Sequence, residues 1–302
     1  MTVTARAPAK VNVHLGVGPL RPDGFHELRT VYLAVSLFDT VTVGPGEGLA
    51  VSVTGEGAGG DVPTDRRNLV WQAAELLAAS AGVPADATIA VAKAIPAAAG
   101  LAGGSADAAA ALVALDELWG TRAAPDDLTN LAAQLGSDVP FSLLGGVALG
   151  RGRGEQVSPV LARQPTHWVL GIAGEGLSTP AVYRELDRLR EVGRLPEGAE
   201  LPPTEAVIAA LRSGSPGELA AALTNDLQAP ALSLRPELRR ALRAAGDAGA
   251  AAALLSGSGP TVAALAEDAQ AAVRLAAVLA GEGLFRTVRA VHGPVAGARV
   301  VA

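Results

Sequence analysis

At 302 residues, 49% of them hydrophobic and 18% charged, the chain can bury the cores of two ordinary domains, and this composition argues against global disorder. A formal net charge of −6 without a basic run argues against a nucleic-acid binder, and the absence of cysteine excludes disulfides, iron–sulfur clusters and thiolate zinc sites. No apolar run has the roughly 18 residues of a membrane helix and no signal segment follows the first residues, so we expect a cytoplasmic protein.

The N-terminal half predicts strands followed by helices. Strands are predicted at Val3–Leu15 (broken at Pro8), Thr30–Val43, Leu49–Thr54 and Thr88–Ala94, with helices at Asn68–Ala81, Ser105–Leu118 and Asp126–Leu135. Asn68 and Ser105 are the predicted N-caps, because their side chains can accept from free backbone N–H groups. The glycine-rich segment Gly55–Asp65 predicts a loop, and short strands interrupted by glycines are expected after Gly146.

The pattern restarts after Ser158–Pro165, which predicts a crossing into a second unit. We expect strands at His167–Ile172, Ala251–Leu255, Thr261–Leu265 and Phe285–Val291, and helices near Pro180–Arg190, Pro203–Leu211, Pro216–Leu223, Pro236–Ala245 and before Leu279. The charged segment Arg184–Pro202 predicts a surface excursion. Because strands and helices mix without strict alternation, the sequence predicts an α+β fold with domains at residues 1–157 and 158–302.

The strongest functional signal lies in the loop before the alanine-rich helix. Most residues from Ala97 to Ala106 are glycine or alanine. Such residues let backbone N–H groups approach a phosphate, and the helix N-terminus adds about half a positive charge. The loop alone is equally compatible with a tight turn whose small residues serve packing. It matches neither the Walker pattern nor the dinucleotide fingerprint.

Three segments in order resemble the GHMP kinases, the family of galacto-, homoserine, mevalonate and phosphomevalonate kinases. They are Ala7–Asn12, Pro96–Ser105 and Leu255–Thr261. Together they span nearly the whole chain, which makes the resemblance far more specific than any one motif. Four further segments, Lys10–Leu15, Arg21–Leu28, Gly136–Phe141 and Asn225–Leu227, resemble members that phosphorylate the 2-hydroxyl of a cytidine diphosphate-linked polyol in the non-mevalonate isoprenoid pathway.

The resemblance implies a fold and a set of ligands. The expected N-terminal domain is like the second domain of ribosomal protein S5, and the expected C-terminal domain is ferredoxin-like. ATP is the implied phosphoryl donor, Mg²⁺ the implied metal, and the small-molecule polyol the acceptor. The implied ATP-binding residues are Pro96, Ala97, Ala98, Ala99, Gly100, Leu101, Ala102, Gly103, Gly104, Ser105 and Ala106.

The family's catalytic pair falls on Lys10 and Asp138. A carboxylate at hydrogen-bond distance can take the acceptor hydroxyl's proton as attack proceeds. A neighbouring lysine would keep that carboxylate ionised and offset charge on the transferring phosphoryl group. From the residues alone, Asp138 reads as a loop or helix-cap residue and Lys10 as a strand-edge surface lysine.

The resemblance also implies an acceptor site. It places a cytosine-stacking aromatic at Phe25, a base-edge hydrogen bond at His26 and the opposite stacking ring at Tyr183, with Asn12 and Thr179 as further substrate contacts. The plain alternatives are core packing for Tyr183 and a polar strand position for Asn12. Many members carry tyrosine at the position of Phe25, which keeps the stacking face.

Two features depart from the family pattern. Ala102 stands where glycine is common, and we expect little disturbance from one methyl group. No glutamate stands out as the Mg²⁺ ligand that some relatives use, so the metal ligands stay unknown, with Ser105 and phosphate oxygens as the candidates.

Three other functions remain as alternatives. One is another family kinase, of the homoserine or mevalonate type, whose acceptor offers no base to stack on Phe25 and Tyr183. Another is a non-catalytic sensor with the same fold. The presence of both Lys10 and Asp138 argues against it. A dehydrogenase is the third. No nucleic-acid or membrane partner is expected, and a homodimer stays open.

Overall fold

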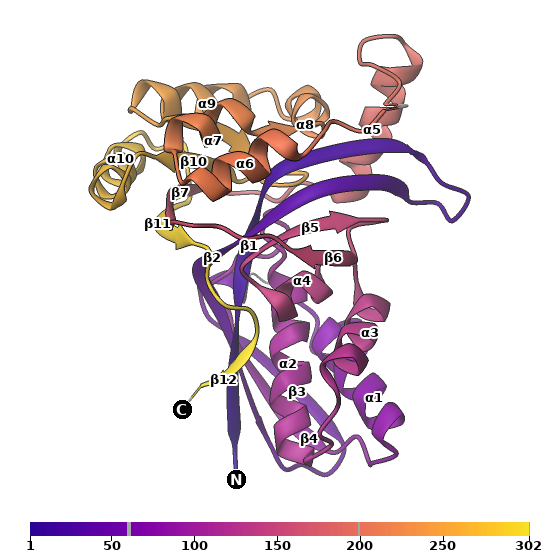
Figure 1. The fold of residues 1–302 in the computed structure, drawn as a ribbon. Coiled ribbons are helices and arrows are strands. Elements are labelled where there is room, and N and C mark those ends of the chain that lie inside the picture. Colours follow the sequence, from indigo (N-terminus) through magenta and orange to yellow (C-terminus); the bar gives the residue numbers. More distant parts are fainter. Residues whose placement is uncertain (59–61, 199, 302) are drawn as a thin grey trace.

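The computed structural model describes residues 1–58, 62–198 and 200–301, arranged as two α+β units that share one long hairpin (Figure 1). Residues 59–61 and 199, inside the predicted loop and surface excursion, lie outside the described residues. The strands are β1 (Val3–Leu20), β2 (His26–Gly44), β3 (Leu49–Thr54), β4 (Ala87–Ala92), β5 (Val147–Arg151), β6 (Gln156–Pro159), β7 (Thr166–Ile172), β8 (Thr224–Asn225), β9 (Ala252–Leu255), β10 (Val262–Ala266), β11 (Thr287–Gly293) and β12 (Arg299–Val301). The helices are α1 (Leu69–Ala81), α2 (Gly103–Trp119), α3 (Pro125–Leu135), α4 (Val139–Leu144), α5 (Thr179–Glu191), α6 (Glu205–Ser213), α7 (Pro216–Ala222), α8 (Gln228–Leu234), α9 (Leu238–Asp247) and α10 (Ala269–Gly281), with a short 3-10 helix at Glu56–Ala58.

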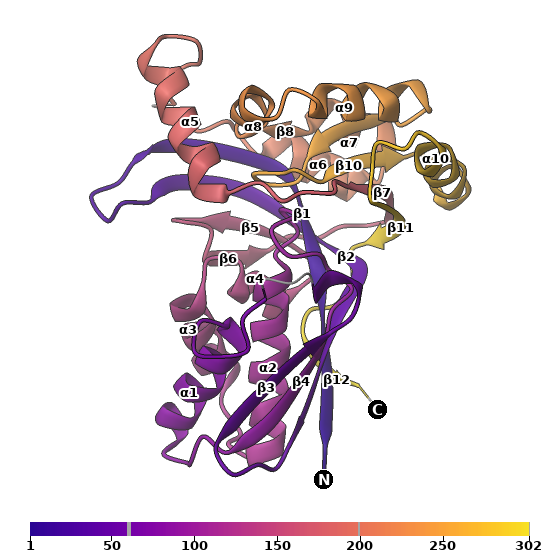
Figure 2. The same cartoon turned by 180° about the vertical axis from the view of Figure 1, so that it is seen from behind.

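The larger sheet follows the order β12-β1-β2-β4-β3, with β5, β6 and β8 attached, and the smaller one the order β11-β7-β10-β9. Helices α1, α2 and α3 cover one face of the larger sheet, and the opposite view brings β3 and β4 to the front (Figure 2). These two sheets confirm the predicted α+β class. Within the described residues, no helix is both long and apolar enough to span a membrane.

The β1–β2 hairpin is longer than predicted, and the expected break at Pro8 is wrong. The strand continues because the ladder shifts register between Pro8 and Ala9, a bulge that accommodates the missing N–H group. The predicted strand stopped at Leu15, whereas β1 continues through Gly16. In the fold it allows close packing, since an added Cβ would lie 2.7 Å from the ring of Pro202.

The predicted ATP-binding segment Pro96–Ser105, called the phosphate loop below, leads into the N-terminus of helix α2. This helix packs its alanine-rich surface against β1, β2 and α1. The predicted N-cap Ser105 is wrong: the cap is Ala102, and Ser105 is the third residue of the helix. The prediction failed because Ala102 adopts a left-handed conformation, φ 58°, which ends the loop without a side-chain hydrogen bond. Asn68, by contrast, is confirmed as the N-cap of α1, accepting from Val70 N.

The C-terminal unit contains most of the predicted elements, including the β9–β10 pair around the glycine turn. Helix α5 confirms the helix predicted near Pro180–Arg190, with Val182, Leu186 and Leu189 buried on one face, and it covers the first part of the predicted surface excursion. The strands β8 and β12, not predicted, both pair with β1, so the chain's end returns to the first sheet.

Candidate active site

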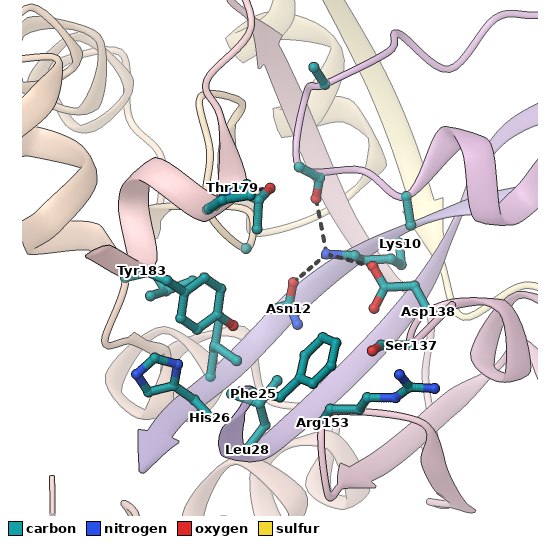
Figure 3. A pocket seen from close by; sticks show the side chains of 18 of the residues that line it. Lys10, Asn12, Phe25, His26, Leu28, Ser137, Asp138, Arg153, Thr179 and Tyr183 are labelled. Atoms are coloured by element: carbon teal, nitrogen blue, oxygen red, sulfur yellow. Dashed lines mark hydrogen bonds and ion pairs between the residues drawn. The ribbon is translucent and has the colours of Figure 1, made fainter. Parts of the chain in front are cut away.

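A cavity of about 680 Å³ lies where the β1–β2 hairpin, the phosphate loop, α5 and the β9–β10 turn meet (Figure 3). It brings together residues that are far apart in the sequence. The predicted site residues that line it are Lys10, Asn12, Phe25, His26, Ala98, Ala99, Gly100, Ala102, Gly103, Gly104, Asp138, Thr179 and Tyr183. Five residues of the predicted ATP loop do not line it: Pro96, Ala97, Leu101, Ser105 and Ala106.

Lys10 lies inside the protein and is not a surface lysine. Its Nζ donates to Asn12 Oδ1 at 2.6 Å and to the Gly100 carbonyl at 3.1 Å, and it lies 3.8 Å from Asp138 Oδ2. Burial lowers the pKa of Lys10, and the charge and hydrogen bonding of Asp138 partly oppose this. The ammonium group therefore joins the phosphate loop to the proposed base.

Asn12 is oriented by a chain of hydrogen bonds along the hairpin. The Thr30 hydroxyl donates to the His14 carbonyl at 2.7 Å, so it can only accept from the Asn12 amide at 2.8 Å. The amide oxygen of Asn12 must then face Lys10. This polar strand residue is thus part of the site.

Asp138 occupies the N-cap position of α4 without using its side chain as a cap. Its carboxylate instead points toward Lys10 (Figure 3) and is 29% exposed. Sequence analysis missed α4, because it is a six-residue helix whose second residue is Pro140. The buried Tyr32, also missed, lines the same part of the cavity, and burial together with the charge of Asp138 raises its pKa.

The phosphate loop uses three left-handed residues: Ala98 (φ 52°), Gly100 (φ 77°) and Ala102 (φ 58°). Gly100 packs against the β9–β10 turn, where an added Cβ would lie 2.2 Å from the Ser256 carbonyl oxygen. The Ser256 hydroxyl also donates to the Gly100 carbonyl at 2.9 Å. The glycine turn therefore supports the loop. Ala102 adopts a left-handed backbone conformation that costs non-glycine residues about 1–2 kcal/mol, and the expected small effect of its methyl group stays a prediction.

A buried charge cluster holds the strand end beneath this loop. Lys93 Nζ donates to Asp39 Oδ2 and Asp107 Oδ2, both at 2.6 Å, and Asp39 Oδ1 accepts from the backbone N–H groups of Ala94 and Ile95. Burial and the neighbouring Asp39 raise the pKa of Asp107 to about 8. The cluster fixes both chain segments from which the loop extends.

Replacing Lys93 with Met should lower the free energy of unfolding by about 3–5 kcal/mol, because two carboxyl groups then stay buried without their cation. Urea denaturation followed by circular dichroism measures the change. The matched control is Arg67→Met, which removes the cation of the exposed Asp65 pair and should cost less than about 1 kcal/mol. Equal, small losses in both variants would show that the cluster does not stabilise the fold.

The opposite end of the cavity is aromatic. The ring of His26 lies 5.0 Å from that of Tyr183, and the guanidinium carbon of Arg153 lies 5.2 Å from the centre of the Phe25 ring. Figure 3 shows Tyr183 and His26 on the far side of Asn12 from Lys10 and Asp138, with the Phe25 ring between Asn12 and Arg153. Arg153 was not among the predicted site residues. It lies between two glycines after a predicted strand, and nothing in that pattern indicates its contact with the Phe25 ring.

Thr179 and the glycine turn close the remaining side. The Thr179 hydroxyl lies 2.9 Å from that of Ser258, which also lines the cavity. Asn225 donates to the Leu255 and Gly257 carbonyls at 2.8 Å each, so it ties the turn to β8.

The residues present allow Mg²⁺ only as an ion held mainly by its substrate. No group of three or more metal-binding side chains occurs within residues 1–58, 62–198 and 200–301. Mg²⁺ often takes one or two protein oxygens together with phosphate oxygens and water. Asp138 in the cavity wall and Ser105 at the start of α2 offer such oxygens.

Sequence relatives match this chain over nearly its full length. It is 59% identical over 299 residues to the 4-diphosphocytidyl-2-C-methyl-D-erythritol kinase of Nocardia farcinica, covering 99% of this chain and 96% of that protein. It is 55% identical over 300 residues to the kinase of the same name from Mycobacterium tuberculosis, covering 99% and 93%.

Solved structures share the arrangement of both units. A crystal structure of 4-(cytidine 5'-diphospho)-2C-methyl-D-erythritol kinase, 37% identical, superposes with a TM-score of 0.75 over 97% of this chain and 98% of that one. A homoserine kinase from Cytophaga hutchinsonii, 18% identical, shares the fold with a TM-score of 0.76 over 99% and 97%. The fold is therefore that of a two-domain small-molecule kinase.

Matches to two family descriptions narrow the class of small-molecule kinases to one family. Residues 68–146 match "GHMP kinases N terminal domain" and residues 207–283 match "GHMP kinases C terminal". The chain belongs to the GHMP kinase family, as its three motifs indicated, and kinases of this family use ATP. Each match falls inside one predicted domain, and the boundary at residue 157 stays a prediction.

Proposed function

We propose that the protein transfers the γ-phosphoryl group of ATP to the 2-hydroxyl of 4-diphosphocytidyl-2-C-methyl-D-erythritol, giving the 2-phosphate and ADP in the non-mevalonate isoprenoid pathway. The relatives of 55–59% identity that carry this name support the assignment. The structural observation that carries it is one cavity with the Lys10–Asp138 pair at one end and the rings of Phe25, His26 and Tyr183 at the other.

The chemical step belongs to the Lys10–Asp138 end of the cavity in this proposal. Asp138 takes the proton of the 2-hydroxyl as its oxygen attacks the γ-phosphorus, and the bond to the β-phosphate oxygen breaks to release ADP. Lys10 offsets charge on the transferring group, and the N–H groups at the start of α2 receive the phosphates of ATP. Mg²⁺, held by ATP with Ser105 or Asp138, would neutralise phosphate charge.

The acceptor's cytosine binds between Phe25 and Tyr183, with His26 at its hydrogen-bonding edge. Homoserine and mevalonate kinases share the fold, but their acceptors carry no base. The aromatic end of the cavity therefore favours a cytidine-linked acceptor over homoserine and mevalonate. A catalytically inactive sensor would have no use for a buried lysine beside a carboxylate. Since ATP and the charged acceptor are cytoplasmic metabolites, we propose that the enzyme works in the cytoplasm.

The direct test is incubation with ATP·Mg²⁺ and a panel of acceptors, read by mass spectrometry. The panel holds the cytidylylated polyol, free methylerythritol phosphate, homoserine and mevalonate. Phosphorylation of the cytidylylated polyol alone is expected. Equal use of free methylerythritol phosphate would show that the cavity does not recognise cytosine. Only the assignment to the kinase family would then stand.

Tyr183→Ala should raise KM for the cytidylylated acceptor about 5- to 150-fold, corresponding to the ~1–3 kcal/mol of base–aromatic stacking. Steady-state kinetics should show KM for ATP little changed. Tyr183→Phe, which keeps the ring, should raise KM far less than Tyr183→Ala. An equal rise in both variants would mean that the hydroxyl group, rather than the ring, binds the acceptor.

A further inference from the structure

Helix α5 holds the ring of His26 through two contacts. Nε2 of His26 lies 2.8 Å from Asp187 Oδ1, and the ring lies 5.0 Å from that of Tyr183 at an interplanar angle of 31°. Tyr183 and Asp187 are four residues apart on α5 and therefore share one face of the helix. All three residues line the cavity, and the His26 side chain is 5% exposed. The imidazole is thus fixed in place and has one ring nitrogen bound.

We propose that Asp187 is a positioning residue that fixes the tautomer of His26 and so makes the site select a base with an amino group over one with a carbonyl group. The inference rests on the proposed function and deepens it. No signal in the sequence pairs these residues, which are 161 positions apart.

The tautomer follows from the chemistry of the two groups. An ionised carboxylate only accepts hydrogen bonds, so Nε2 must carry the proton that it shares with Asp187. In the neutral ring, Nδ1 then has a free lone pair. Within the part of the chain that the structure describes, no hydrogen bond engages Nδ1. A ligand in the cavity therefore meets an acceptor at this nitrogen.

This acceptor distinguishes the two pyrimidines. Cytosine presents an amino donor where uracil presents a carbonyl acceptor. The amino group can donate to Nδ1, whereas the uracil oxygen would face a lone pair and lose its hydrogen bond to water. Sites built to bond a polar group reject the analogue that lacks it much more strongly than apolar pockets reject a change of size.

Asp187→Asn tests the inference, because an amide can donate to Nε2 as well as accept from it and so permits both tautomers. The measurement is kcat/KM for cytidine- and uridine-linked acceptors. We expect the cytidine-to-uridine ratio to fall at least tenfold, with KM for ATP unchanged. Glu191→Gln, the same loss of charge at the exposed end of α5, should leave the ratio as in the wild type.

His26→Ala and the double variant show whether Asp187 acts through His26. His26→Ala should lower the ratio at least as much as Asp187→Asn, and combining the two should lower it no further. Additive losses would mean that Asp187 contacts the base itself. An unchanged ratio in Asp187→Asn would overturn the inference outright.

Nitrogen NMR of protein with ¹⁵N-labelled histidine gives a readout that needs no acceptor. The His26 ring, assigned by its loss in His26→Ala, should carry its proton on Nε2 in the wild type and on both nitrogens in exchange in Asp187→Asn. A proton on Nδ1 in the wild type, in either a neutral or a charged ring, would overturn the inference. Should the wild type ignore the cytidylylated acceptor, the proposed function fails, and this spectrum still decides the pairing of Asp187 with His26.

Discussion

Asp138→Asn is expected to lower kcat about 10²- to 10⁴-fold, the usual contribution of a positioned general base, and to leave ATP affinity nearly unchanged. The amide has the size of the carboxylate but cannot take the acceptor's proton. The change also removes the group that opposes the effect of burial on Lys10, so the pKa of Lys10 should fall further. Single-turnover kinetics and calorimetric titration with ATP measure the two quantities separately.

The control for this variant is Asp127→Asn, which removes an exposed carboxylate at the start of α3, outside the cavity. It should turn over as the wild type does. Near wild-type turnover in Asp138→Asn would exclude Asp138 as the general base. Its contact with Lys10 would then be a structural one. A loss of ATP binding in that variant would instead show that Asp138 holds the nucleotide or its metal.

Local signals predicted the longer helices well, because caps and periodic apolar residues lie within a few positions of each other, but they missed the short helices α4 and α8. Asn68 begins α1 and Gly120 follows the end of α2, as their residue types indicate. Errors in the strands came from long-range contacts. Strand β12 has three residues and exists through its pairing with β1, almost 300 positions away. Ser105 was preferred as a cap because nothing in the sequence shows that Ala102 adopts a left-handed conformation.

The same division between what sequence motifs predict and what only long-range contacts determine applies to the cavity residues. The motifs that resemble the family placed Lys10, Asp138 and the aromatic residues, and the structure brings all of them to one cavity. Tyr32, Arg153 and Asp187 carry no motif, and only the fold brings them to it. Their partners, respectively Asp138, Phe25 and His26, are more than 100 positions away in the chain.

The phosphate loop offers a sharp test because its glycines differ in their surroundings. Gly100 has a left-handed φ of 77° and no room for a Cβ, so its replacement would deform the loop itself. Gly104 has no such constraint: the nearest atom to an added Cβ is Leu69 Cδ1 at 3.8 Å, and the residue faces the cavity. A side chain there would occupy the space that a phosphate needs beside the backbone.

Gly104→Val should therefore abolish ATP binding without unfolding the protein, because the branched Cβ keeps phosphate away from the N–H groups at the start of α2. Calorimetric titration measures the binding, and circular dichroism reports the fold. The matched control is Gly217→Val, the same change at the second residue of α7, where an added Cβ meets nothing within 4 Å. It should bind ATP as the wild type does. Unaltered ATP affinity in Gly104→Val would mean that the loop is a tight turn built for packing, and the nucleotide would have to bind elsewhere.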